Sequence, residues 1–188
     1  VVRYVNDFIL PMHLSYTFQN QTISAMKLFF SEIYSRPLVI EKLERPRGEH
    51  RLPNVLSRDE IKRLIAGVIN LKHRAMLSLT YGCGLRRQEV LNLKLNDIDS
   101  KRGIINIRQS KGRKDRMVPV SEKLLELLRE YYKVYRPESF LFEGDEKGVM
   151  YSPSSFENVL KRSCRKVGIS KPVTLHWLRH SYATHLLE

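Results

Sequence analysis

Two histidines and an arginine lie within five residues of one another in HWLRHSYATHLLE (176–188). On a helix, residues three and four apart are neighbours, so His176, Arg179 and His180 would share one face. A guanidinium beside an imidazole could bind a phosphate and take part in proton transfer. Histidines four residues apart also suit zinc, but Trp177 replaces the glutamate of a zinc protease helix and no third ligand is evident. Metal binding is therefore disfavoured, and His180 could simply be a partly buried histidine with satisfied hydrogen bonds.

A second arginine is offered by the stretch GCGLRRQEV (82–90). A helix that starts at Arg86 would place Arg86 and Glu89 on one face, where the carboxylate could fix the orientation of the guanidinium. Gly84 would allow the backbone to approach a neighbouring group closely. The pair could bind a phosphate, or it could be an ordinary surface ion pair, and this segment alone leaves both interpretations open.

Basic residues gather in IRQSKGRKDRMVPV (107–120), which predicts a β-hairpin. A charged hairpin tip is often only a solvated loop, but four cations within six residues favour contact with nucleic acid. A lysine at such a tip could also donate a proton to a departing oxygen. The four cations are Lys111, Arg113, Lys114 and Arg116.

The composition points to a polyanionic partner. Lys and Arg number 33 against 20 Asp and Glu, which gives a net charge of +13, and each neutralised phosphate would release counterions. Cys83 and Cys164 lack CxxC spacing, so neither a disulfide framework nor a zinc site is expected. No signal peptide and no apolar run of about 18 residues is evident. We expect a soluble, cytoplasmic protein that binds nucleic acid, without a membrane partner, a metal or another cofactor.

The elements that must position these residues are mostly helical. Ser57 and Glu60 have the pattern of a capping box, so a helix should begin there. The segments NDID, GIINIRQ and RMVPV predict three short strands. The expected fold class is mainly α with a small three-stranded antiparallel sheet. The expected helices of this part cover about residues 57–70, 72–81, a short segment from Arg86, and about 121–135, 153–167 and 174–187.

The N-terminal stretch SYTFQNQTISAMKLFFSEIYS (15–35) predicts a further helix, with apolar residues at helical spacing. The stretch RPRGEHRLPNV (45–55) is rich in Pro, Gly and charge, which is typical of a linker. We expect a partial helical domain over 1–46, a linker over 47–55 and a second domain over 56–188. The polar face of the helix presents Gln19, Gln21, Thr22, Ser24 and Lys27.

Three motifs in order, GLRRQE, SKGRKDRMVPV and HWLRHSYATHLL, resemble the Arg box, the β-hairpin lysine and the H-x-x-R box of the tyrosine recombinases, the phage integrase family of site-specific DNA recombinases. The resemblance covers about residues 55–188, and SYTFQNQTISAMKLFFSEIY resembles the end of the family's helical, SAM-like core-binding domain. It implies that 56–188 is the catalytic domain and that 1–46 is part of the core-binding domain.

The resemblance also implies roles for individual residues. Arg86 and Arg179 would clamp the scissile phosphate. Lys111 would protonate the leaving 5′-oxygen, and His176 would assist proton transfer at the nucleophile. Glu89 and His180 would support the clamp. The expected DNA-binding residues are Gln19, Gln21, Thr22, Ser24, Lys27, Arg87, Arg113, Lys114 and Arg116.

The family's nucleophilic tyrosine would lie beyond Glu188, so we expect a fragment that binds DNA and clamps the phosphate but does not cleave. Tyr182 should be a core residue rather than the nucleophile, since it lies with Leu175, Leu178 and Leu186 on an apolar stripe that should pack inward. The complete enzyme would form a 3′-phosphotyrosyl intermediate and work as a homo-tetramer on DNA. Alternatives are a non-catalytic DNA-binding accessory protein and a metal-dependent nuclease.

Overall fold

The computed structural model describes residues 4, 7–8, 11–12, 14–35, 54–108 and 115–188. Two compact units make up the chain, Val1–Leu52 and Pro53–Glu188, and each is described by itself. No helix within these described ranges is long and apolar enough to cross a membrane.

Helix α2 (Tyr16–Tyr34) dominates the N-terminal unit, as predicted. Ser15 caps it by accepting a hydrogen bond from the backbone N–H of Phe18, which satisfies one of the first-turn donors. The helix ends where Ser35 adopts a left-handed conformation, at φ 49°. Ile23 is buried in this unit, whereas several large apolar side chains are exposed. The exposed ones on this helix are Tyr16, Phe18, Leu28, Phe29, Ile33 and Tyr34.

The C-terminal unit is mainly α with one three-stranded antiparallel sheet of order β1-β2-β3, which confirms the predicted fold class. Ile105 of β2 pairs with Val118 of β3, and both are buried. The helices are α3 (Arg58–Ala66), α4 (Leu71–Gly82), α5 (Arg87–Asn92), α6 (Glu122–Tyr135), α7 (Pro153–Lys166) and α8 (Leu175–Leu187). The strands are β1 (Ile98–Asp99), β2 (Ile104–Ile107) and β3 (Arg116–Pro119), and the short 3₁₀ helix η2 (Leu95–Asp97) precedes β1.

Helix α4 is the centre of the core. Every residue from Ala75 to Thr80 is buried, as expected for a helix surrounded by other elements. It packs against α6 on one side and α8 on the other, and both views of the ribbon show this arrangement. Helix α4 therefore fixes the position of α8, the helix that carries the H-x-x-R motif.

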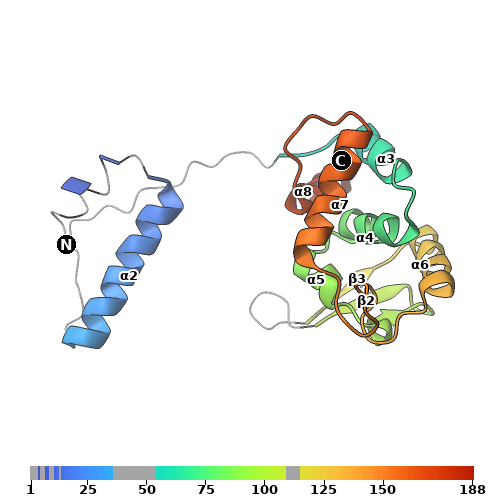
Figure 1. Ribbon diagram of the computed structural model, residues 1–188, viewed down its shortest axis with the longest axis horizontal. Coiled ribbons are helices and arrows are strands. Elements are labelled where there is room, and N and C mark those ends of the chain that lie inside the picture. The colour runs from blue at the N-terminus through green and yellow to red at the C-terminus, as the bar shows by residue number, and fades with distance from the viewer. Residues whose placement is uncertain (1–3, 5–6, 9–10, 13, 36–53, 109–114) are drawn as a thin grey trace. The chain divides into compact units, whose positions relative to one another are not determined.

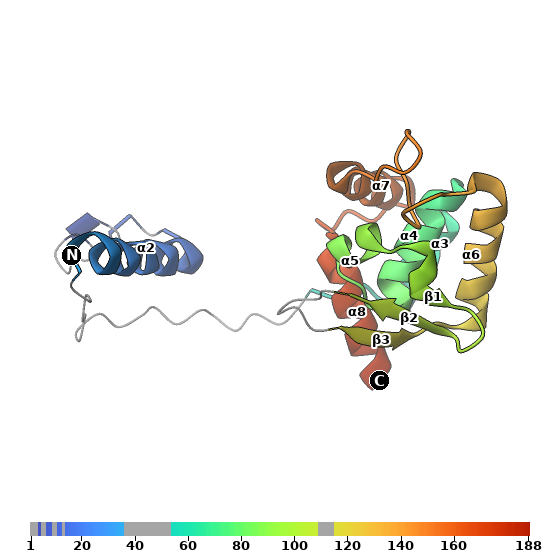
Figure 2. The same ribbon diagram turned by 90° about the horizontal axis from the view of Figure 1, so that it is seen from below.

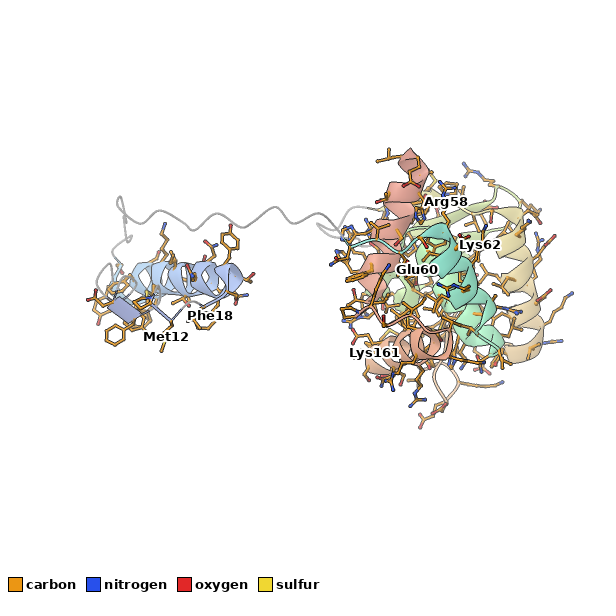
Figure 3. The ribbon with its side chains drawn as sticks, turned by 90° about the horizontal axis from the view of Figure 1, so that it is seen from above. Met12, Phe18, Arg58, Glu60, Lys62 and Lys161 are labelled. Carbon is orange, nitrogen blue, oxygen red and sulfur yellow. The ribbon has the colours of Figure 1, made fainter. Side chains whose placement is uncertain are left out.

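The start of α3 has the capping box that the sequence predicts. The Ser57 hydroxyl accepts a hydrogen bond from the backbone N–H of Glu60 at 3.1 Å. The Glu60 carboxylate accepts one from the backbone N–H of Ser57 at 2.8 Å. Figure 3 labels Glu60 near the start of this helix. The helix ends at Ala66, earlier than predicted, because Gly67 caps it and Asn70 caps the next helix by accepting from the backbone N–H of His73.

Helix α8 is fixed to the rest of the unit by polar contacts. The backbone N–H of Leu56 donates to the Ser181 hydroxyl at 2.9 Å, and Arg58 donates to the carbonyl of His185 at 2.9 Å. Leu175 and Leu178 are buried as expected, but Leu186 is 68% exposed, so the predicted inward stripe is wrong at that position. Leu186 lies in the last turn of α8, and Figure 2 shows this end of the helix reaching past the sheet.

Candidate active site

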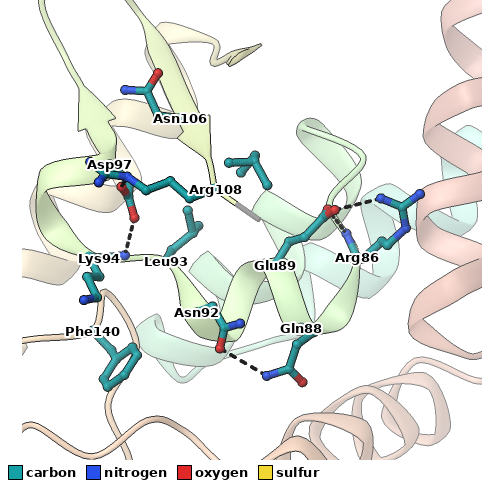
Figure 4. Close-up of a pocket in the computed structure, with 11 residues that line it drawn as sticks. Arg86, Gln88, Glu89, Asn92, Leu93, Lys94, Asp97, Asn106, Arg108 and Phe140 are labelled. Atoms are coloured by element: carbon teal, nitrogen blue, oxygen red, sulfur yellow. Dashed lines mark hydrogen bonds and ion pairs between the residues drawn. The ribbon is translucent and has the colours of Figure 1, made fainter. Parts of the chain in front are cut away.

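The carboxylate of Glu89 is the centre of the candidate site. Glu89 lies in the first turn of α5, and its side chain is only 8% exposed. Its oxygens accept the backbone N–H of Arg86 at 2.8 Å and a guanidinium N–H of the same residue at 2.8 Å (Figure 4). The predicted pair of Arg86 and Glu89 therefore forms, with Arg86 at the N-cap of the helix instead of inside it.

A second arginine reaches the same carboxylate from the sheet. Arg116, the first residue of β3, donates from two guanidinium nitrogens to the two oxygens of Glu89, each at 2.7 Å. Burial by itself would raise the pKa of Glu89, but hydrogen bonds from Arg116 and Arg86 outweigh it and lower the pKa to about 2. Glu89 is therefore a carboxylate at any physiological pH.

Arg179 of α8 is the third arginine of this cluster. One of its guanidinium nitrogens lies 3.8 Å from a carboxylate oxygen of Glu89 and donates a hydrogen bond to the carbonyl oxygen of Gly84. Gly84 is buried and adopts a φ of +57°, which glycine reaches without strain. Partial burial lowers the pKa of Arg179, and the nearby charge of Arg86 lowers it further. Two like charges are thus held close together on separate elements.

His176 and His180 stack edge to face one turn apart on α8, with ring centroids 4.3 Å from each other. Partial burial lowers the pKa of His176 below its ordinary value of 6.5, and the charges of His180, Arg179 and Arg86 act in the same direction. The imidazole of His176 is therefore neutral at pH 7 and able to accept a proton. Across the described ranges, no group of three or more His, Cys, Asp or Glu side chains could hold a metal ion.

One pocket brings the two arginines and the histidine together. It has a volume of about 330 Å³, and Arg86, His176 and Arg179 line it. Arg87 and Glu157 also line this pocket and form an ion pair that connects α5 to α7. Two guanidinium groups and an imidazole around one hollow could bind an anion, with the imidazole as an acid/base group beside it.

A second pocket of about 410 Å³ adjoins Arg86 and Glu89 (Figure 4). Its walls carry amide side chains, among them Asn92 and Asn106, and Arg108, which pairs with the buried carboxylate of Asp97 at 2.8 Å. Two hollows therefore share Arg86.

Comparison with known proteins identifies the family. A sequence model of the phage integrase family matches residues 54–188, which contain the Glu89 cluster and the pocket beside it. The chain belongs to the phage integrase family. The membership predicted from three short motifs is thereby confirmed.

Relatives of this family member include tyrosine recombinases from two other organisms. The chain is 37% identical over 176 residues to a tyrosine recombinase of Thermosipho africanus, covering 88% of the chain and 60% of the relative. It is 36% identical over 172 residues to tyrosine recombinase XerA of Pyrococcus horikoshii, covering 90% of the chain and 59% of the relative. The chain therefore spans about 60% of the length of each of these curated relatives.

Solved structures of recombinases have the same fold. The crystal structure of XerA recombinase has a TM-score of 0.67 at 34% identity, covering 98% of this chain and 67% of that one. XerH bound to its difH substrate has a TM-score of 0.73 at 23% identity, covering 93% of this chain and 55% of that one. The predicted tyrosine-recombinase catalytic fold is confirmed by this agreement.

The structure brings together five of the six predicted catalytic and supporting residues, which are Arg86, Glu89, His176, Arg179 and His180. The sixth, Lys111, lies outside the described residues, as do Arg113 and Lys114. The functional roles of all of them remain predictions.

The other expected DNA-binding residues lie in different surroundings. On α2, Gln19 and Thr22 donate side-chain hydrogen bonds to backbone carbonyls of their own unit, while Gln21 and Ser24 are exposed and Lys27 is half-buried. In the C-terminal unit, Arg87 and Arg116 each pair with a glutamate.

Sequence reasoning missed three contacts of the site. These are the pairing of Arg116 with Glu89, the pairing of Arg87 with Glu157, and the packing of Tyr182 against Gly84. Each joins residues from different elements, so no local spacing signals it. The one available hint is Gly84 itself, which the sequence marks as a point of close backbone approach.

Proposed function

We propose that this chain is the phosphate-binding portion of a site-specific DNA recombinase, with double-stranded DNA as its partner. The observation that carries the proposal is the convergence of Arg86, Arg179 and His176 on one pocket from separate elements. Three guanidinium groups surround the single carboxylate of Glu89 and leave net positive charge, which a phosphodiester at the pocket would balance. The net charge of +13 fits a polyanionic partner.

In the proposed reaction, Arg86 and Arg179 bind the non-bridging oxygens of one phosphodiester. A tyrosine oxygen loses its proton, attacks phosphorus and forms a 3′-phosphotyrosyl bond, while the bond to the 5′-oxygen breaks. The two arginines stabilise the charge that develops on the five-coordinate phosphorus. His176, neutral at pH 7, assists proton transfer at the nucleophile.

In the whole protein, the proposed reaction ends with protonation of the leaving strand and release of the tyrosine. Lys111, outside the described residues, protonates the departing 5′-oxygen. The 5′-hydroxyl of a partner strand then attacks the phosphotyrosine, which frees the tyrosine and rejoins the DNA without a high-energy cofactor. The attacking tyrosine belongs, in this proposal, to a longer form of the chain.

The names of the structural neighbours support DNA as the substrate. XerH is described bound to its difH substrate in a pre-cleavage complex and to a palindromic difH substrate in a post-cleavage complex. The Tn1549 transposon integrase is described in complex with circular intermediate DNA. The family resemblance also implies four copies on two duplexes, so a homo-tetramer on DNA is part of the proposal for the complete protein.

Strand cleavage tests the proposal. A longer form of the chain that includes the family's tyrosine would be incubated, with EDTA present, on nicked suicide duplexes that this chain selects from a random DNA pool. The expected result is a covalent protein–DNA adduct on a denaturing gel. Tight binding without an adduct would instead support a non-catalytic DNA-binding accessory protein. Cleavage that requires added metal would support a nuclease that uses His176 and His180.

A further inference from the structure

Glu89 makes unequal contacts with the three arginines around it. Arg116 meets both carboxylate oxygens through two guanidinium nitrogens at 2.7 Å, whereas Arg86 meets one oxygen through a guanidinium nitrogen and the other through its backbone N–H, each at 2.8 Å. Arg179 stays 3.8 Å away. Arg116, whose guanidinium pairs with both oxygens, is thus the one of the three arginines that does not line the pocket of Arg86, His176 and Arg179.

Pairing with Arg116 would keep Glu89 from neutralising Arg86 and Arg179, the two arginines proposed to clamp the phosphate. A carboxylate that paired face to face with Arg86 or Arg179 would compete with a phosphate for the same guanidinium. Because the guanidinium of Arg116 pairs with both oxygens, Glu89 shares its single charge between Arg116 and Arg86 and balances only part of the charge of the cluster. Three guanidiniums around one carboxylate leave an excess of positive charge where a phosphodiester would bind.

The surroundings of Arg116 do not resemble those of an arginine that anchors DNA. Its side chain is 31% exposed, and its partner carboxylate is 8% exposed. The hydrogen bond to Glu89 raises the pKa of Arg116, so the pair is charged at all relevant pH values. Drawing Arg116 away toward a DNA phosphate would leave a buried carboxylate with fewer partners, which is costly.

We infer that Arg116 is a positioning residue of the phosphate clamp, which holds Glu89 from strand β3 so that Glu89 aligns Arg86 and Arg179 without neutralising them. The inference rests on the proposed function and replaces the DNA-contact role expected from the sequence. The sheet would then contribute to the site, because Arg116 of β3 holds Glu89 of α5 in position.

The test compares Arg116→Gln, Arg116→Lys and the control Arg102→Gln, which removes one charge from the exposed turn between β1 and β2. In the longer form of the chain, single-turnover cleavage of bound DNA should fall by about 10–100-fold in both Arg116 variants, as for other residues that orient a reactive group. Lysine should not rescue, because an ammonium cannot hold a carboxylate in a bidentate way. Arg102→Gln should cleave like the wild type.

DNA affinity provides the independent readout. A positioning residue predicts that the slope of log K against log salt stays at the wild-type value in Arg116→Gln, whereas the loss of a phosphate contact would reduce it by about 1. A reduced slope with an unchanged cleavage rate would overturn the inference. If the wild type forms no adduct, the proposed function fails, and the slope still decides whether Arg116 anchors DNA. If Arg116→Gln does not fold, Arg116→Lys carries the comparison, and wild-type cleavage by that variant would overturn the inference.

Discussion

The ring of Tyr182 lies directly over Gly84, at the place that a Cβ atom on residue 84 would occupy. This packing brings α8 against the turn before α5. It also sets the carbonyl of Gly84 within reach of the Arg179 guanidinium. A glycine and an aromatic ring thus fix the spacing between the two elements that carry the arginines. Tyr182 therefore packs against the site, but it is half-buried and not one of the buried core residues, where the sequence predicts it.

Replacing Gly84 with alanine should destabilise the C-terminal unit. The left-handed φ of +57° costs about 1–2 kcal/mol for a residue with a Cβ, and crowding against Tyr182 adds about 1–3 kcal/mol. Urea unfolding measures the change. The matched control is Gly168→Ala, because Gly168 has a φ of +72° but nothing lies near its added Cβ. Equal losses in the two variants would contradict close packing at Gly84.

The Glu89 carboxylate should make stability depend on pH. Its folded-state pKa of about 2 lies below the ordinary value of 4.5, so its contribution is fully present above pH 4.5 and is lost as the pH falls toward 2. The size of this contribution is about 3 kcal/mol. Urea unfolding of the wild type and of Glu89→Gln should differ most near pH 6 and converge toward pH 2. The control is Glu126→Gln, on the exposed side of α6, whose free energy of unfolding should depend on pH as that of the wild type does. If the pH dependence of Glu89→Gln also matched that of the wild type, the ion cluster around Glu89 would be excluded.

Breaking the ion pair between Arg87 and Glu157 should strengthen DNA binding. Exposed pairs of this kind contribute little to stability, so Glu157→Gln would release Arg87 at small cost. We expect affinity to rise about 3–10-fold at low salt, with a slope against salt steeper by up to about 1. Fluorescence anisotropy with one labelled duplex measures both quantities. The control Glu126→Gln removes the same charge from α6, away from Arg87. An equal gain in DNA affinity in that variant would mean that net charge alone is responsible.

Cleavage should fall at acid pH because His176 must be neutral to accept a proton. Its pKa is lowered below 6.5 by partial burial and by His180, Arg179 and Arg86, so the acid limb of the rate profile should lie below pH 6.5. His176→Gln should remove the limb and lower the plateau by about 10²-fold. His180→Gln should move the limb to higher pH. If the rate fell at the same acid pH in the wild type and in both variants, a group other than His176 would be the one that titrates.

The sequence predicts the local parts of this molecule well. The capping box at Ser57 marks the start of α3, and the spacing of Arg86 and Glu89 predicts their ion pair, since both signals lie within one helical turn. Helix α4 is predicted over about residues 72–81, close to its bounds in the structure, Leu71–Gly82. Its role as the centre of the core depends on packing that no local pattern encodes.

Contacts between distant segments could not be predicted. Arg116 and Glu89 are 27 positions apart, and Arg87 and Glu157 are 70 apart. The sequence predicts both arginines as DNA contacts and gives no sign of these ion pairs, because a basic residue looks the same in sequence whether it faces solvent or a carboxylate. The exposure of Leu186 was missed for a similar reason, because periodicity shows a face of a helix but not where the neighbouring elements end.

The central claim is that Arg179 acts on the phosphate during the reaction rather than only holding DNA. The measurement is the single-turnover rate of covalent adduct formation by the longer form of the chain, taken together with DNA affinity, for the wild type, Arg179→Ala and the exposed control Arg165→Ala. Arg179→Ala should slow adduct formation by at least about 10²-fold at saturating protein, while Arg165→Ala should cleave bound DNA at the wild-type rate. Adduct formation at the wild-type rate in Arg179→Ala would contradict the central claim.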